Sequence, residues 1–198
     1  MSEYKPIKLI LLGESGVGKT NLIRIAIGKE FVSNINTTLT NSFCESQITV
    51  DEKLYKYYLW DTVGQEKYRS LNKLFIKDSK IILLVFAIDS RESFNEVDFW
   101  HKYVKELLEE ENYIFALIGN KADLYEEENT VKDNEIEEKA KEFKIKFIVT
   151  SALTDSAGFK KFLNEILVDY INKYHPEEYK DPNSFKINSK GKNKKKCC

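Results

Sequence analysis

A glycine-rich segment near the start of the chain constrains the fold more than any other feature. Residues 13–20 read GESGVGKT and satisfy the spacing G-x-x-x-x-G-K-[ST]. Small residues let successive backbone N–H groups curl around an anion and point at its oxygens. The lysine adds a positive charge, and the following hydroxyl is a ligand that Mg²⁺ accepts. The segment therefore predicts a loop that binds a polyphosphate and Mg²⁺, through Ser15, Gly16, Val17, Gly18, Lys19 and Thr20.

The flanks of this segment have the order that a phosphate-binding loop needs. Residues 7–12 are mostly apolar and predict a buried strand, and residues 21–27 are apolar at helical spacing. A helix that starts at Gly18 would direct its positive end at the same anion. The alternative is a glycine-rich turn before an ordinary helix. The complete motif between matching flanks favours the phosphate-binding loop.

Strand-like and helix-like stretches alternate along the rest of the chain. Strands are expected at 43–50, 54–60, 81–88, 113–118 and 145–149, and helices at 94–108, 135–143 and 159–174. Asp51-Glu52-Lys53 is a hairpin signal, Ser93 is a candidate helix cap, and residues 126–134 are expected to form a charged loop. The pattern predicts an α/β fold of the P-loop NTPase type, with a six-stranded, mostly parallel sheet, one antiparallel edge strand, and helices on both faces.

Composition limits the chain to one domain and a tail. Its 198 residues suit a domain over 1–175 followed by a flexible basic tail over 176–198. The longest apolar run, 81–88, is too short to span a membrane, and no signal peptide is evident, so we expect a cytosolic protein. Cys44 is expected to be a small buried side chain.

Charge is distributed unevenly along the sequence. Residues 180–198 contain seven Lys and one Asp, which gives this segment +6 and leaves −7 on the preceding residues, for a net charge of −1. An acidic domain argues against nucleic-acid binding, whereas the basic tail suits an anionic surface.

Polar clusters follow the predicted strands at the ends where open α/β sheets bind ligands. They are the 13–20 loop, Asp61-x-x-Gly64, Asn120-Lys121-x-Asp123 and Thr150-Ser151-Ala152. A polar stretch over 29–42 is a long loop of the kind that is usually functional. This convergence indicates one ligand site built from several loops.

With these motifs, the chain resembles the Ras-like small GTPases, and the Rab branch most closely. The resemblance covers about 5–174 and includes residues 60–70, WDTVGQEKYRS. It implies a GTPase that cycles between GTP- and GDP-bound states and regulates vesicle trafficking on membranes. In this family Asp123 would read guanine through two hydrogen bonds, Asn120 would join two loops, and Lys121 and Phe31 would flank the base. The backbone around three further residues would reach the guanine O6: Ser151, Ala152 and Leu153.

The resemblance also implies a switch. Thr38 and the Gly64 N–H would contact the γ-phosphate, and Thr20, Thr38 and Asp61 would serve the Mg²⁺ ion. Gln65 would orient the attacking water. Residues 29–42 contain no Arg, so hydrolysis should be slow without an activating partner. The other implied partners are effectors, an exchange factor, and the prenylation and GDI machinery.

Two surface features are carried over in the same way. Phe43, Trp60 and Phe75 match the aromatics that shape the Rab effector surface, although they could equally be plain core residues. Cys197 and Cys198 follow a Lys-rich stretch and resemble the doubly geranylgeranylated Rab ending. The alternative is a basic solubility tail. The resemblance implies a cytosolic pool and a lipid-anchored pool on the cytoplasmic face of an intracellular membrane.

Four departures from the family pattern bear on the activity. They are Thr40-Asn41-Ser42 before the aromatic Phe43, Val63 in place of Ala, Ile35 in place of an aromatic, and Leu153 in place of Lys. A hydrolysis-deficient, GTP-binding membrane scaffold is therefore an open alternative. A P-loop kinase or ATPase is disfavoured, because N-K-x-D argues against adenine and the chain has only three Arg for a second phosphate substrate.

Overall fold

The computed structural model describes residues 3–33, 35, 38, 42–62, 69–108, 112–125, 130–174 and 178–179. Its centre is a six-stranded sheet with the strand order β3-β4-β2-β5-β6-β7. The strands are β2 (Ile7–Leu12), β3 (Ser42–Val50), β4 (Lys53–Asp61), β5 (Ile81–Ala87), β6 (Ile114–Asn120) and β7 (Lys146–Val149). All neighbours pair in parallel except β3 and β4, which form the antiparallel hairpin. The predicted fold class is confirmed.

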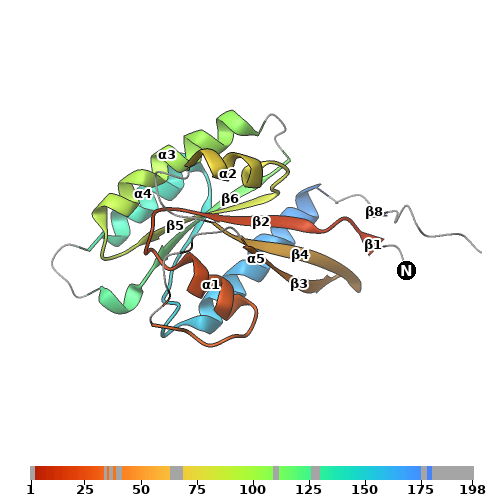
Figure 1. Ribbon diagram of the computed structural model, residues 1–198, viewed down its shortest axis with the longest axis horizontal. Helices are drawn as coiled ribbons and strands as arrows, with labels where there is room; N and C mark the ends of the chain where they lie inside the picture. Colours follow the sequence, from red (N-terminus) through yellow and green to blue (C-terminus); the bar gives the residue numbers. More distant parts are fainter. Residues whose placement is uncertain are drawn as a thin grey trace, which may run out of the picture.

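Helices cover both faces of this sheet (Figure 1). The helices are α1 (Lys19–Ala26), α2 (Arg69–Ile76), α3 (Arg91–Leu107), α4 (Asp133–Phe143) and α5 (Ser156–Tyr174), with a short 3₁₀ helix over Ala122–Leu124. Core side chains of α1 and α5 pack together on one face, and those of α2, α3 and α4 pack on the other.

The two cores explain why the central strands are almost entirely apolar. In β2, Leu9 and Leu11 belong to the core under α1 and α5, whereas Ile10 and Leu12 belong to the opposite core. Successive strand residues point to opposite faces, so a strand covered on both sides has few polar positions. Every residue of β5 is buried for the same reason.

Some local expectations need correction. The cap of α3 is Ser90 and not Ser93, because the helix begins at Arg91 and the Ser90 Oγ accepts a hydrogen bond from the Ser93 N–H at 3.2 Å. The expected loop over 126–134 is shorter, since α4 begins at Asp133; residues 126–129 lie outside the described part. Cys44 is half-buried and packs against the α1–α5 core from the edge strand β3.

A second, very small sheet was not anticipated. The strand β1 (Glu3–Tyr4) pairs antiparallel with β8 (Glu178–Tyr179). This pairing brings a short part of the 176–198 segment beside the beginning of the domain, as Figure 1 shows. Within the described ranges, no helix is both long and apolar enough to cross a bilayer.

Candidate nucleotide-binding site

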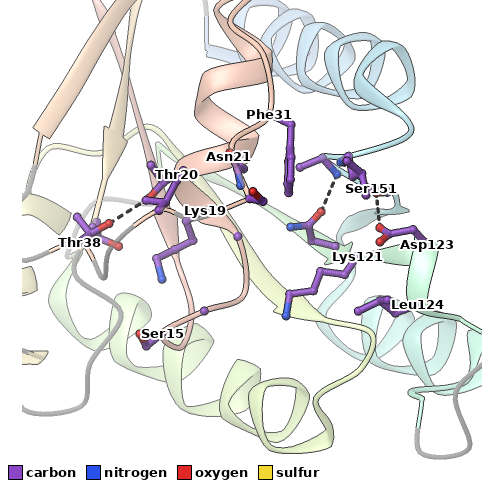
Figure 2. A pocket seen from close by; sticks show the side chains of 18 residues that line it. Ser15, Lys19, Thr20, Asn21, Phe31, Thr38, Lys121, Asp123, Leu124 and Ser151 are labelled. Carbon is purple, nitrogen blue, oxygen red and sulfur yellow. Dashed lines mark hydrogen bonds between the residues drawn. The ribbon is translucent and has the colours of Figure 1, made fainter.

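The loops at the carboxyl ends of the strands enclose one elongated cavity of about 490 Å³. Its walls come from the 13–20 loop, the start of α1, the chain between Phe31 and Thr38, and the loops after β6 and β7. Figure 2 shows Thr20 and Thr38 at one end, Asp123 and Ser151 at the other, and Lys19 and Lys121 between them. The cavity brings together most of the residues that the sequence motifs single out.

Glycine is required where the phosphate loop packs against its neighbours. Gly18 precedes α1 with φ of 95°, and a Cβ placed there would lie 2.2 Å from the Asn120 side-chain nitrogen. Gly13 has φ of 151°, and a Cβ there would lie 2.0 Å from the Val85 carbonyl oxygen. Both positions exclude larger residues, because a side chain would collide with the backbone of β5 or with the Asn120 side chain at the end of β6.

Lys19 is buried at the centre of the cavity. Its Nζ donates hydrogen bonds to the backbone carbonyl oxygens of Gly13 at 2.9 Å and Glu14 at 2.8 Å. Burial lowers the pKa of this ammonium to about 8, and the nearby carboxylates of Asp61 and Glu14 offset part of that effect. A polyphosphate in the loop would compensate for the hydration that burial removes from this ammonium group.

Three oxygen-bearing side chains meet beside Lys19. Thr20 Oγ1 donates to Asp61 Oδ2 at 2.8 Å and lies 3.0 Å from Thr38 Oγ1. The other carboxylate oxygen, Asp61 Oδ1, is buried and has no hydrogen-bond partner among the described residues. Burial raises the pKa of Asp61, and contacts with Thr20 and Lys19 oppose the rise. A hard divalent cation suits such a donor set, so these residues fit Mg²⁺.

The opposite end of the cavity has a hydrogen-bond network of its own. Asn120 Nδ2 donates to the Val17 carbonyl at 2.8 Å, and Asn120 Oδ1 accepts from the Ala152 N–H at 3.0 Å. The Ser151 hydroxyl donates to one carboxylate oxygen of Asp123. Asn120 therefore joins the phosphate loop to the loop after β7, while Ser151 orients Asp123.

Lys121 and Leu153 complete the walls at this end. Lys121 adopts a left-handed conformation with φ of 65°, and its Nζ lies 3.2 Å from Asp89 Oδ2. Leu153 lines the cavity and is 55% exposed. Phe31 lines the same cavity and is half-buried. The flat faces of a planar ligand group would be enclosed here between side chains that come from separate segments.

The three aromatics assigned to a surface role form one contiguous cluster outside this cavity. The rings of Phe43 and Trp60 stack with centroids 5.0 Å apart, and Trp60 lies 5.4 Å from Phe75. Phe43 is 54% exposed although it lies in a strand. The cluster joins β3, β4 and α2 and presents one apolar edge to solvent.

Several predicted site residues lie outside the described residues: Gly64, Gln65, Cys197 and Cys198. Three residues with defined contacts were not singled out by motif: Asn21, Thr62 and Asp89. Thr62 is buried and donates to the Leu11 carbonyl at 2.6 Å. Thr62 follows a motif aspartate and Asn21 follows a motif threonine, so adjacency to motif residues was the available signal.

Comparisons with known proteins give the class to which this site belongs. The model of the Ras family matches residues 8–173. The chain is 37% identical over 161 residues to the Ras-related protein Rab-11B of Dictyostelium discoideum, a match that covers 80% of this chain and 71% of the relative. It is 33% identical over 190 residues to the Ras-related protein RABE1e of Arabidopsis thaliana, with 95% and 86% of the two chains covered.

A third relative shows the same relationship over most of the domain. The Ras-related protein rab-11.1 of Caenorhabditis elegans is 33% identical over 170 residues, which cover 84% of this chain and 80% of the relative. The chain belongs to the Ras family, and it is a Rab-like small GTPase that binds guanine nucleotide and hydrolyses GTP.

Proposed function

We propose that this protein is a Mg²⁺-dependent GTP/GDP switch whose nucleotide state is read on membranes that carry vesicle traffic. The observation that carries the proposal is the meeting of Thr20, Thr38 and Asp61. Thr38 lies 18 residues after Thr20 in the sequence, yet its hydroxyl lies at the phosphate end of the cavity. A ligand that binds there acts directly on the position of that loop.

Each end of the cavity has a distinct role in this proposal. Asp123 accepts hydrogen bonds from the N1–H and the exocyclic amine of guanine, and adenine does not offer that pair of donors. Lys19 and the backbone of the phosphate loop hold the phosphates. Thr20, Thr38 and Asp61 would hold the Mg²⁺ ion, which would supply positive charge to the phosphate oxygens. Loss of the γ-phosphate would release Thr38.

Hydrolysis is assigned to a water molecule that Gln65 orients. The test is single-turnover hydrolysis of preloaded GTP in the wild type and in Gln65→Leu, with nucleotide binding measured in parallel. We expect slow hydrolysis in the wild type and none in the variant, because leucine cannot hold a water molecule for attack. This result would establish a timer and justify a search for an activating partner that supplies an arginine.

The competing function is a GTP-loaded scaffold that does not hydrolyse its ligand. Val63 motivates it, since its side chain is larger than the Ala of the family pattern and a displaced water would react slowly. Tight GTP binding without hydrolysis in both proteins would favour the scaffold. Recovery of hydrolysis in Val63→Ala would then identify the cause.

We further propose membrane attachment through lipidated Cys197 and Cys198. The support is the Lys-rich stretch over 190–196 and the resemblance to doubly prenylated endings. Effectors, an exchange factor, an activating protein, and the prenylation and GDI machinery are the corresponding partners. Flotation of lipid-modified protein with anionic vesicles tests the anchor. The Cys197→Ser, Cys198→Ser double variant should remain unbound, and equal flotation of both proteins would contradict lipid anchoring.

A further inference from the structure

Asn21 makes two hydrogen bonds to the backbone of the loop that follows α1. Its Nδ2 donates to the Val32 carbonyl at 2.9 Å, and its Oδ1 accepts from the Val32 N–H at 3.1 Å. One side-chain amide thus satisfies both backbone groups of a single residue, as a neighbouring strand would. This contact holds the chain at Val32 against α1.

Arg24 holds the same loop one position before Phe31. Its Nε donates to the Glu30 carbonyl at 3.1 Å, and the Lys29 N–H donates to the Arg24 carbonyl at 2.8 Å. Residues three apart on a helix lie on one face, so Asn21 and Arg24 reach the loop from the same side of α1. Their contacts at Glu30 and Val32 bracket Phe31.

Phe31 lies between these two contacts, at the end of the cavity that Asp123 and Ser151 line, which is called the base end below. Its side chain lines the cavity and packs partly against the core formed by α1 and α5. In Figure 2 Phe31 stands between Asn21 and Ser151. The Phe31 side chain has no polar group, and the hydrogen bonds at Glu30 and Val32 hold the backbone on each side of it.

We propose that Asn21 and Arg24 form a clamp that positions Phe31 as a wall of the base pocket and thereby slows nucleotide dissociation. Both are positioning residues that act through Phe31. The proposal rests on the guanine nucleotide function stated above. A loop held before the ligand binds loses less conformational entropy on binding, so the bound state is favoured.

The clamp should act equally on both nucleotide states. Its hydrogen bonds end at Glu30 and Val32, and Phe31 lies at the base end of the cavity, away from the phosphate end where Thr20 contacts Thr38. The γ-phosphate distinguishes GTP from GDP only at the phosphate end. The clamp should therefore set the residence time of both nucleotides, whereas Thr38 should distinguish them.

The test measures dissociation of fluorescently labelled GDP and of a labelled, non-hydrolysable GTP analogue in the presence of Mg²⁺. The clamp variants are Asn21→Leu, which removes both bonds at similar volume, and Arg24→Leu, which removes the bond to Glu30. Asn95→Leu is the matched control, since Asn95 is an exposed helical asparagine on α3. Phe31→Ala, alone and combined with Asn21→Leu, shows whether the effect passes through Phe31.

We expect Asn21→Leu to raise both dissociation rates by about tenfold and Arg24→Leu by about threefold, in line with two and one partly exposed hydrogen bonds. Asn95→Leu should leave the rates unchanged. In the Phe31→Ala background, Asn21→Leu should have little further effect.

Four results would overturn the clamp. They are unchanged rates in both folded clamp variants, an effect confined to the GTP analogue, full additivity with Phe31→Ala, and an equal effect in Asn95→Leu. If Asn21→Leu fails to fold, Arg24→Leu decides alone. A wild type that retains no guanine nucleotide would instead refute the function on which the clamp rests.

Discussion

The two ends of the cavity differ in how far their polar groups are satisfied by the protein itself. At the base end, Asn120 bonds to Val17 and Ala152, and Asp123 is oriented by Ser151. At the phosphate end, Lys19 bonds only to carbonyl oxygens in the described contacts, and one oxygen of Asp61 has no partner among the described residues. The base end is organised in advance, whereas the phosphate end is built to receive charge.

This difference indicates how the two ends contribute to recognition. A preorganised network discriminates between ligands, since a wrong base leaves buried polar groups unpaired. A buried lysine is stabilised most by a ligand that brings negative charge, and a buried carboxylate is stabilised most by a bound cation. We therefore expect variants of Asp123 to change which nucleotide binds, and phosphate-end conditions to change how tightly any nucleotide binds.

The largest expected effect is at Asp123. Asp123→Asn should lower the affinity for GDP on the order of a thousandfold, because the amide offers a donor where guanine also has a donor. The same amide suits xanthine, which carries an oxygen at that position. Binding titrations with GDP and xanthosine diphosphate check both statements. Equal losses for both ligands would show that Asp123 serves only the structure.

Asn120 tests the connection between the two ends. Asn120→Ala would leave the Val17 carbonyl and the Ala152 N–H without their partner, and both bonds are buried. We expect GDP to dissociate about a hundredfold faster, from two lost buried hydrogen bonds. A change below about threefold would mean that the two loops hold their positions independently.

The smallest of the three effects expected in this comparison of the two ends is a pH dependence at the phosphate end. The pKa of Lys19 is about 8 because the group is buried, and bound phosphate would raise it. Above pH 8, binding must then take up a proton, so affinity should fall by up to about tenfold per pH unit. Calorimetry between pH 7 and 9, in two buffers of different ionisation enthalpy, measures this uptake.

The same shift has a defined sign for folding of the ligand-free protein. An unfolded lysine keeps its ordinary pKa of 10.5. Between pH 8 and 10.5 the unfolded state therefore binds more protons, and the contribution of this group to the free energy of unfolding rises with pH.

For the pH dependence of nucleotide binding, Lys19→Arg is the control, because a guanidinium stays charged throughout. A pH slope of binding that survives in Lys19→Arg would assign the effect to another group.

Much of the fold could be predicted from the sequence, because apolar runs, helical spacing and turn residues mark its strands, helices and turns. The apolar run 81–88 predicted a strand covered on both faces, and every residue of β5 is buried. The hairpin turn at Asp51-Glu52-Lys53 and the order of strands and helices were predicted in the same way. Helix starts were less accurate: Ser90 and Ser93 are both acceptable caps, and only the backbone path into α3 selects Ser90.

The site was accessible only in part. Local motifs placed Lys19, Thr20, Asn120 and Asp123 at or just beyond the carboxyl ends of strands, and all of them line the cavity. The contacts of Asn21 with Val32 and of Lys121 with Asp89 carry no motif. They depend on how a loop folds back on its helix and on how two strands place their ends together.

The sequence by itself determined the strand and helix order, the glycine-rich loop over 13–20 and the N-K-x-D motif, because each is encoded by residues close together in the chain. Only the tertiary structure decided which carbonyl oxygens hold Lys19, how Asn120 joins Val17 to Ala152 across 135 residues of sequence, and that α1 brackets Phe31. These contacts form between segments that the parallel sheet brings together at one edge. The residues of each segment do not by themselves indicate which other segment will lie beside it.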